Sequence, residues 1–584
     1  FGHTVYAVST VLAAFMGGLA LGSVLFGRAA DRSPRPIRLY GILEIAIGAF
    51  AVATPLLVPA VERLYLAYAQ RAGLPASGFS PIQFALVFGI LVIPTTLMGG
   101  TLPILTRFFV QHQDEIGGQV GRLYALNTFG AVGGAALAGF SLLPGLGLHR
   151  SLWLGAAVNI GIGLLAIGLD RYLQRRTSGA APAMPRAMER ASAPESSASA
   201  PSRAAAVLIL LVFGTSGAAS MMYEVGWTRA LSLVLGSSTY AFTTMLVAFL
   251  GGLAAGSALF ARWWGGRPLS VWSPGLIQLG IGLSAAMVLP FIDRLPELFL
   301  AVFRITQNPR AIVVAQFLLG AGMMLVPTLF MGATFPCTVR VLVRQLDSVG
   351  FSVGRIYAVN TLGAILGTLV AGFLLIPQWG VQRSLLAAMS LNLAGAAVIA
   401  AIGLRGARRT LPALTVVGAS VALAVLPMIP KWNPNVMVAG VVVYGPMYAE
   451  GSGEARLRDL VSVDEELLYY RDGVGATVSV QRRGEEKFLR VNGKTDASNL
   501  SDMRTQLMLG HLPLMLHPDP RRVLVIGLGS GVTAAAVVQH PVVTVDVVEI
   551  EPAVIEAAGY FAKENRNVLA HPRVRVHVAD GRHF

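Results

Sequence analysis

Long apolar runs dominate residues 1–430, and they constrain the fold more than any other feature of this sequence. A helix that crosses a bilayer core needs about 20 mostly apolar residues. With 54% hydrophobic and only 13% charged residues, the composition excludes a wholly soluble enzyme and a disordered protein. We therefore predict a polytopic all-α membrane domain, with spans near 5–27, 38–60, 82–106, 121–143, 151–169, 204–222, 239–261, 273–292, 311–331, 354–376, 384–404 and 411–430.

The apolar part contains two parallel sequence repeats, one within residues 1–169 and the other within 204–430. YAVSTVLAAFMGGLALGSVLFGR (6–28) shares 15 of 23 residues with the segment at 240–262, and GRLYALNTFGAVGGAALAGFSLLP (121–144) shares 14 of 24 with the segment at 354–377. Parallel repeats also relate the halves of major-facilitator transporters, which is an analogy at the level of the fold only. The second repeat has an extra helix ahead of its aligned part, so we expect its counterpart to precede Phe1.

The charge is divided unevenly along the chain. Residues 1–430 carry a net charge of +16, and residues 431–584 carry −1. The arginines of the first part lie in short loops between apolar runs, as in the positive-inside pattern, and Arg28, Arg32, Arg405 and Arg409 mark the cytoplasmic side. Residues 170–203, rich in Ala, Ser, Pro and Arg, are predicted to be a flexible linker. A basic stripe interleaved with aromatic residues is missing from the sequence, so we predict no nucleic-acid partner.

Residues 431–584 have frequent charges and a different periodicity. We predict a small β segment in residues 431–500, where short strands alternate with glycine turns. In residues 501–584 strands alternate with helices, which predicts a parallel Rossmann-like α/β domain that is truncated at its C-terminal end. Cys337 is the only cysteine, so the sequence predicts no disulfide and no cysteine-based metal site. We expect neither a metal nor a tightly bound cofactor.

The clearest chemical motif is VLVIGLGSGVTAAA (523–536), an apolar strand that runs through a glycine-rich turn into a helix. Gly527, Gly529, Ser530 and Gly531 make up the turn, where the backbone can approach a ligand closely. Glu549 ends the next strand, 18 residues after Gly531, where an acidic residue takes the ribose hydroxyls. The turn lacks the last glycine of a dinucleotide loop, which favours S-adenosylmethionine or a related nucleoside over NAD.

A third acidic position follows the next strand. Asp580 lies where a carboxylate can accept a hydrogen bond from an adenine amino group. The alternative is that the glycine turn is structural, with a solvated Glu549 and an ordinary turn Asp580.

These segments resemble the spermidine synthase (polyamine aminopropyltransferase) family over about residues 465–584, notably at HLPLMLHPDPRRVLVIGLGSG (511–531), VEIEPAVIEAA (548–558) and DGRHF (580–584). The whole arrangement is similar to bacterial membrane-fused spermidine-synthase-like proteins. The resemblance implies that Glu549 binds the ribose of decarboxylated S-adenosylmethionine, the co-substrate, or of the product methylthioadenosine. It implies that Asp580 faces the adenine and that the three glycines surround the sulfonium end.

The sequence also departs from that family. Ser530 stands where soluble members have an Asp, and Asp496 stands where they have a Gln. A Tyr-His pair of the family aligns with Thr505 and Gln506. The position of the catalytic Asp lies beyond Phe584, so we assign no catalytic residue. Asp496 and Asp502 are the local candidates for binding the far ammonium group of a polyamine; the alternative is that they are solvated loop acids.

Ionisable residues inside apolar spans are candidates for function by default. Glu44, Glu224 and Arg229 are such candidates here, although interfacial charges are the simpler interpretation. Glu224 and Arg229 are close enough in sequence to pair with each other.

The leading hypothesis is a membrane-anchored aminopropyltransferase-like enzyme. The alternative is a multi-pass transporter of a polyamine or related cation with a nucleoside-sensing C-terminal domain, and a methyltransferase ranks third. We expect a multi-pass protein of the bacterial inner membrane, in contact with lipid and a small nucleoside. If 411–430 spans the bilayer, Arg405 and Arg409 put the C-terminal domain outside the cytoplasm, whereas the pocket motif places it inside, and we expect the inside. The sequence does not predict the oligomeric state.

Overall fold

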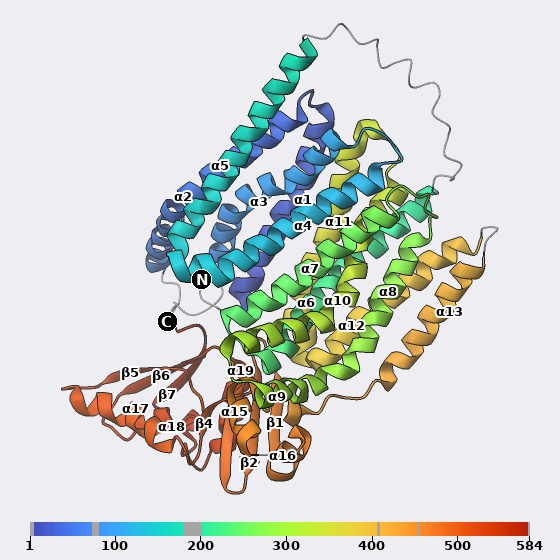
Figure 1. The fold of residues 1–584 in the computed structure, drawn as a ribbon. Helices are drawn as coiled ribbons and strands as arrows, with labels where there is room; N and C mark the ends of the chain where they lie inside the picture. Colours follow the sequence, from blue (N-terminus) through green and yellow to red (C-terminus); the bar gives the residue numbers. More distant parts are fainter. Residues whose placement is uncertain (1–4, 73–80, 179–200, 406–408, 452–454, 582–584) are drawn as a thin grey trace.

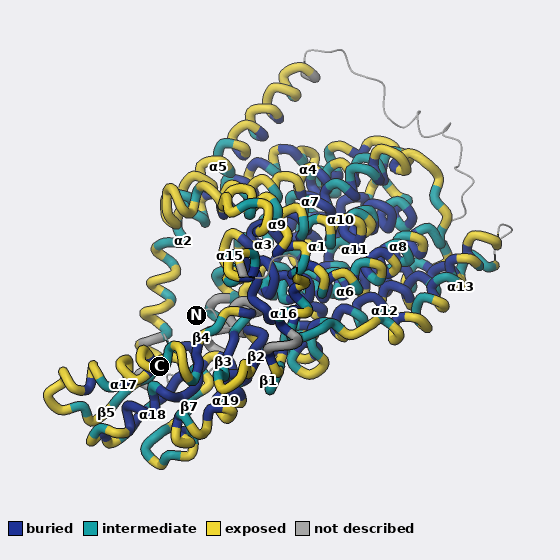
Figure 2. Tube along the Cα trace, turned by 60° about the horizontal axis from the view of Figure 1, so that its bottom comes forward, coloured by how far each residue is buried: buried dark blue, intermediate teal, exposed yellow. Residues whose placement is uncertain are grey.

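A computed structural model describes residues 5–72, 81–178, 201–405, 409–451 and 455–581. It consists of a helical region (residues 5–428) and a C-terminal region (residues 434–581), which lies against one end of the helices (Figure 1). Within these described residues, ten helical segments are long and apolar enough to cross a membrane, judged by length and composition alone. Figure 2 shows that buried residues concentrate in the centre of the helical region, whereas α5 is largely exposed at its side.

The helices follow the predicted apolar runs, apart from Leu295–Ile305, which lies between two of them. They are α1 (Val5–Arg32), α2 (Pro36–Ala72), α3 (Pro81–Phe109), α4 (Ile116–Leu137), α5 (Leu143–Ser178), α6 (Arg203–Leu235), α7 (Thr239–Trp263), α8 (Ser273–Val288), α9 (Leu295–Ile305), α10 (Pro309–Leu342), α11 (Val349–Leu369), α12 (Ile376–Gly403) and α13 (Thr410–Val425). The backbone turns sharply at Gly147 (φ 74°) in α5 and at Gly380 (φ 81°) in α12. Residues 170–178 of the predicted linker are helical, and residues 179–200 lie outside the described residues.

Small residues let these helices approach closely. A Cβ on Gly22 of α1 would lie 1.8 Å from the Thr96 carbonyl oxygen, and a Cβ on Gly256 of α7 would lie 1.9 Å from that of Leu329. Only glycine fits at such backbone contacts, as in other tightly packed apolar helices. α1 therefore packs on α3 much as α7 packs on α10.

The buried serines of the two helices make matching contacts as well. Ser23 Oγ donates to the Gly354 carbonyl (2.9 Å), and Ser257 Oγ donates to the Gly121 carbonyl (3.0 Å). These contacts fall at aligned positions of the two sequence segments. The matching contacts are consistent with a duplicated helical unit, which stays a prediction.

The C-terminal region begins with three short helices that the sequence analysis did not predict: α14 (Pro434–Met437), α15 (Val441–Gly451) and α16 (Leu457–Asp464). An antiparallel sheet follows, in the order β1 (Glu466–Asp472), β2 (Thr477–Arg483), β3 (Glu486–Val491), β4 (Lys494–Ser498). The last elements are α17 (Met503–Leu516), β5 (Arg522–Ile526), α18 (Val532–Val537), β6 (Thr544–Glu549), α19 (Pro552–Ala558) and β7 (Val574–Val578). Strands β5, β6 and β7 pair in parallel in that order, as the alternation of strands and helices predicts.

Charged side chains connect the two regions. Asp472 Oδ2 at the end of β1 accepts a hydrogen bond from the Val381 N–H (2.9 Å), directly after the turn at Gly380 in α12. Arg458 of α16 forms ion pairs with Asp293 (3.1 Å) and Glu297 (3.3 Å) beside α9. The C-terminal region is thus joined to the end of the helical region at which α12 begins.

Candidate functional site

The glycine-rich turn follows β5 and leads into α18. Gly527, Gly529 and Gly531 have φ values of 86°, 55° and 82°, in the left-handed region that glycine adopts without strain. A Cβ on Gly531 would lie 3.0 Å from the Asn565 side-chain nitrogen, whereas one on Gly527 would meet nothing within 4 Å. The conformation of the turn therefore depends on glycine, and the space beside Gly527 is open for a ligand.

Glu549 ends β6 next to this turn and is only 7% exposed. Its Oε2 accepts a hydrogen bond from the Leu528 N–H (2.9 Å), and its Oε1 accepts one from the Glu551 N–H (3.0 Å). A carboxylate has about four lone-pair sites, so each oxygen retains capacity for a further donor. The carboxylate is thus buried and fixed in orientation, as binding to a pair of ribose hydroxyls requires.

Asp580 follows β7 at the same edge of the parallel sheet. Glu549 pairs with Val578 in the β6–β7 register, and the Ala579 N–H donates to the Glu549 carbonyl (3.1 Å). Asp580 is 8% exposed. Ligands of parallel α/β sheets bind at the carboxyl ends of the strands, and the glycine turn, Glu549 and Asp580 all lie there.

Ser530 belongs to a polar network on the α17 side of the turn. It is 1% exposed, and its hydroxyl donates to Gln506 Oε1. Gln506 Nε2 in turn donates to the Ser498 carbonyl (2.7 Å) and to Asp502 Oδ1 (3.1 Å), which also accepts from the Ser498 N–H (2.8 Å). Ser530 and Asp502 therefore join α17, β4 and the turn, and Asp502 is no solvated loop acid.

Asp496 lies apart from this network. It is exposed on β4 and pairs with Lys494 (3.2 Å). The structure brings Asp502 next to the glycine turn and leaves Asp496 at the surface.

Glu551 is a site residue that the sequence analysis missed. It is 4% exposed, and its Oε2 accepts from the N–H groups of Gly475 (2.6 Å) and Ala476 (3.0 Å). Its Oε1 accepts from the Ala553 N–H (3.2 Å), which caps α19. The signal in the sequence was an acidic residue directly before Pro552, a typical start of a helix. Glu551 fixes the β1–β2 turn against the strand that carries Glu549.

The candidates in the helical region lie in different surroundings. Arg229 of α6 donates to the Gly473 carbonyl, in the turn that Glu551 holds, and no ion pair joins it to Glu224 in the part of the chain described. Glu44 of α2 is 9% exposed and hydrogen-bonded to Tyr40. Of the three, only Arg229 contacts the C-terminal region in the contacts described.

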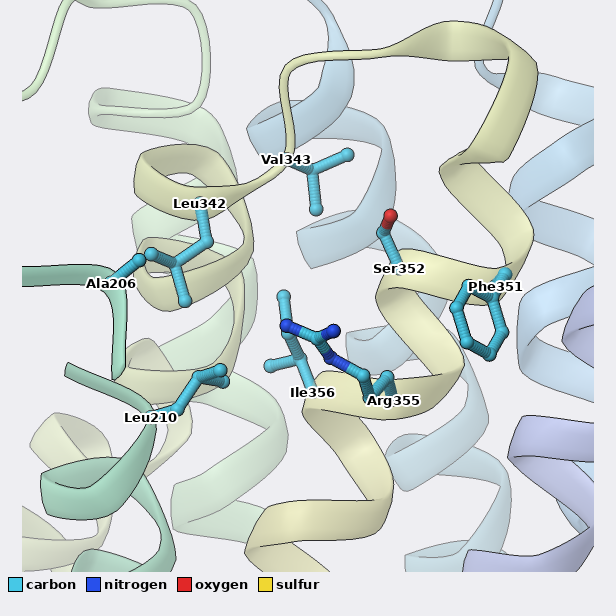
Figure 3. Close-up of a pocket in the computed structure, with 8 residues that line it drawn as sticks. All are labelled: Ala206, Leu210, Leu342, Val343, Phe351, Ser352, Arg355 and Ile356. Atoms are coloured by element: carbon cyan, nitrogen blue, oxygen red, sulfur yellow. The ribbon is translucent and has the colours of Figure 1, made fainter. Parts of the chain in front are cut away.

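Cavities also occur away from the glycine turn in the described part of the chain, and two of them lie between packed elements. A cavity of about 760 Å³, here called the junction cavity, lies between α12, the end of α13 and β1. A smaller one of about 130 Å³ lies between α6, α10 and α11, where the Arg355 side chain reaches in among Leu210, Leu342 and Ile356 (Figure 3). Neither is lined by the predicted nucleoside-binding residues.

Comparison with known proteins gives the same family for the C-terminal region. Residues 503–584 match the protein family described as "Spermine/spermidine synthase domain". The polyamine aminopropyltransferase of Corynebacterium efficiens is 26% identical over 378 residues, covering 63% of this chain and 65% of that protein. That of Mycobacterium tuberculosis is 26% identical over 388 residues, covering 64% and 66%. The spermidine synthase of Dictyostelium discoideum is 39% identical over 97 residues, covering 16% and 34%.

Among solved structures, the spermidine synthase from Thermotoga maritima matches 20% of this chain and 41% of its own, at 27% identity and a TM-score of 0.19. The chain spans 65% of the Corynebacterium relative and 34% of the Dictyostelium relative. Alignments of 378 and 388 residues are longer than the C-terminal region and must extend into the helical region. The resemblance predicted from the sequence is thus confirmed as a spermidine-synthase-type domain at residues 503–584, and the membrane-fused form stays a prediction.

Proposed function

We propose that this protein is a membrane-anchored aminopropyltransferase-like enzyme that binds decarboxylated S-adenosylmethionine, or a related nucleoside, and transfers an aminopropyl group to a polyamine. The observation that carries the proposal is Glu549, a buried carboxylate that two backbone N–H groups orient beside an open glycine turn. It lies within the segment that matches the synthase family. No comparison supports the alternative of a transporter.

The proposed reaction is a displacement at the carbon next to a sulfonium. A neutral amine of the polyamine attacks this carbon, a C–N bond forms, and the C–S bond breaks with its electron pair going to sulfur. Methylthioadenosine leaves, and a carboxylate takes the proton from the new ammonium.

Each residue of the site has a distinct task in this proposal. Glu549 holds the ribose, Asp580 faces the adenine, and the backbone at Gly527 and Gly529 lies close to the sulfonium end. Asp502 is the remaining candidate for the far ammonium of the polyamine, although its Oδ1 already accepts hydrogen bonds from Ser498 and Gln506.

Titration calorimetry of the full chain with methylthioadenosine tests the pocket. Glu549→Gln keeps the shape of the side chain and removes its charge, and a charge-assisted hydrogen bond contributes about 1.5–3 kcal/mol. We expect binding to weaken about tenfold to a hundredfold. Glu556→Gln, an exposed carboxylate change in the same region, is the matched control and leaves the affinity unchanged. Equal affinity of the wild type and Glu549→Gln refutes the proposed pocket.

We also propose that the helical region spans the bacterial inner membrane. Supporting this are the ten long apolar segments and outward-facing side chains such as Leu56 (77% exposed) and Leu165 (74% exposed). The need for the nucleoside donor favours a cytoplasmic C-terminal region. The arginine distribution favours the opposite side, because α13 runs from Arg409 to the end that carries this region. A reporter fused after Lys431 decides: activity only as an exported reporter contradicts the use of a cytoplasmic donor.

A further inference from the structure

The junction cavity combines free positive charge with apolar walls. Arg383 of α12, Lys431 after α13 and Arg471 of β1 line it from three separate segments. Arg471 is paired with Glu556, whereas neither Arg383 nor Lys431 has a hydrogen-bond or ion-pair partner on its side chain among the described residues. Two cations are therefore available to a ligand in this cavity.

No acid in the lining neutralises these cations. Asp472 is the only acidic residue that lines the cavity within the described part of the chain. It is 8% exposed, and it accepts hydrogen bonds from the Val381 N–H (2.9 Å) and from the hydroxyls of Tyr470 (3.1 Å) and Thr477 (2.8 Å). The Asp472 carboxylate thus binds α12 to β1. Because it is engaged there, the positive charges of Arg383 and Lys431 make the cavity favour an anion.

One part of the cavity wall is apolar. It is formed by Leu386 and Ala387 of α12, Leu423 of α13 and Leu426 directly after α13. Trp379 and Trp432 lie at the same cavity, and Trp432 donates its indole N–H to the Leu289 carbonyl (3.0 Å). Tryptophans with one polar and one apolar edge are typical of the level at which lipid headgroups meet hydrocarbon.

An exposed apolar face of α13 leads to this wall. Large apolar side chains recur along it at helical spacing and are 48–77% exposed: Leu411, Leu414, Val417, Val421, Val425 and Met428. The last two flank Leu426 and Pro427, which line the cavity. The cavity thus combines cations with an apolar surface that continues along α13.

We propose that the junction cavity binds an acidic glycerophospholipid, with Arg383 and Lys431 holding its phosphate and α13 contacting its acyl chains. Phosphate and guanidinium or ammonium groups form strong charge-assisted hydrogen bonds. A free phosphate shares the headgroup chemistry, but the exposed face of α13 favours a ligand with hydrocarbon attached. This inference rests on the proposed membrane setting and does not depend on aminopropyl transfer.

Native mass spectrometry of the full chain in detergent tests the site, with phosphatidylglycerol and phosphatidylcholine as probes. We expect the wild type to retain phosphatidylglycerol at about tenfold lower lipid concentration than phosphatidylcholine, as one charge-assisted contact would give. The double variant Arg383→Gln/Lys431→Gln loses this preference. Arg310→Gln at the start of α10, another exposed arginine outside the cavity, keeps it.

A second variant keeps the test valid if the double variant does not fold. Ala387→Trp fills the cavity from α12 without changing its charge, and it too abolishes the preference for phosphatidylglycerol. The inference is overturned if both variants retain the preference for phosphatidylglycerol. It is also overturned if millimolar inorganic phosphate displaces bound phosphatidylglycerol as readily as a second lipid does. A wild type that binds methylthioadenosine but shows no lipid preference overturns the lipid site alone, so the two failures are distinguishable.

Discussion

Many buried hydroxyls of the helical region find an acceptor within their own helix, whereas buried carboxylates of the C-terminal region find donors in distant loops. In the helical region, Thr95 and Thr328 donate their hydroxyls to carbonyls four residues earlier in the same helix (2.6 and 2.7 Å). In the C-terminal region, Glu549 and Glu551 accept hydrogen bonds from loops far away in the sequence. The helical region thus combines close packing with a few bonds between helices, such as that from Ser23 to Gly354. In the C-terminal region carboxylates fix the loops, which is where a site for chemistry can be built.

The largest expected effect tests packing in the helical region. Gly256→Ala places a methyl group against the Leu329 carbonyl, so α7 must move away from α10, at a cost of about 3 kcal/mol. Gly251→Ala on the same helix meets open space and is the control. Thermal unfolding of the protein in detergent measures both. Equal melting temperatures for the two variants would contradict the role of close backbone contact.

The second test concerns the loops held by carboxylates. Glu551→Ala removes the acceptor of the N–H groups of Gly475, which is exposed, and Ala476, which is buried, at a cost of about 3 kcal/mol. Hydrogen exchange at these two amides should become about a hundredfold faster. Glu556→Ala on the same helix, α19, removes an exposed carboxylate and should leave their protection intact. Unchanged protection in Glu551→Ala would show that the β1–β2 turn is held by other contacts.

A third test addresses the departure at Ser530. Ser530→Asp restores the acid of soluble family members, but it places a carboxylate beside Gln506 and Asp502 in a buried network. We expect a loss of about 2 kcal/mol in stability and no gain in polyamine binding. Denaturant unfolding and calorimetry with spermidine measure the two effects. Tighter spermidine binding by the variant would mean that the position faces the ligand.

The smallest effect is a dependence on pH at the surface of the C-terminal region. The hydrogen bond from Arg471 holds the pKa of Glu556 below its ordinary value of 4.5. A carboxyl whose pKa is lowered by folding stabilises the folded state above that ordinary value, and this contribution is lost as pH falls through the lowered pKa. Because the pair is about half exposed, solvent screening limits it to about 0.5 kcal/mol. Denaturant unfolding at pH 7 and pH 3 should show a smaller drop for Glu556→Gln than for the wild type.

Local patterns predicted a large part of this structure. The strand and the helix predicted on either side of the glycine turn in 523–536 are β5 (Arg522–Ile526) and α18 (Val532–Val537), because apolar periodicity and glycine positions act within a few residues. The short helices α14–α16 were missed, since their stability comes from packing against distant segments such as α9.

In the candidate site, too, the residues of a local motif were predicted, whereas their distant partners were not. Gly527 and Gly531 were recognisable from the turn they form. The partners of Ser530 and Glu551 were not, because Gln506 and Gly475 lie 24 and 76 residues away from them, and no local pattern encodes such pairs.

The sharp turn at Gly380 has a consequence for the order in which the chain is made. Helical N–H groups directly after such a turn lack an acceptor within their own helix. The acceptor for Val381 is Asp472, which lies 91 residues further along the chain. Ribosomes add about 5–20 residues per second, so roughly five to twenty seconds pass between the synthesis of Val381 and that of Asp472. The hydrogen bond from the Val381 N–H can therefore form only after β1 has been translated.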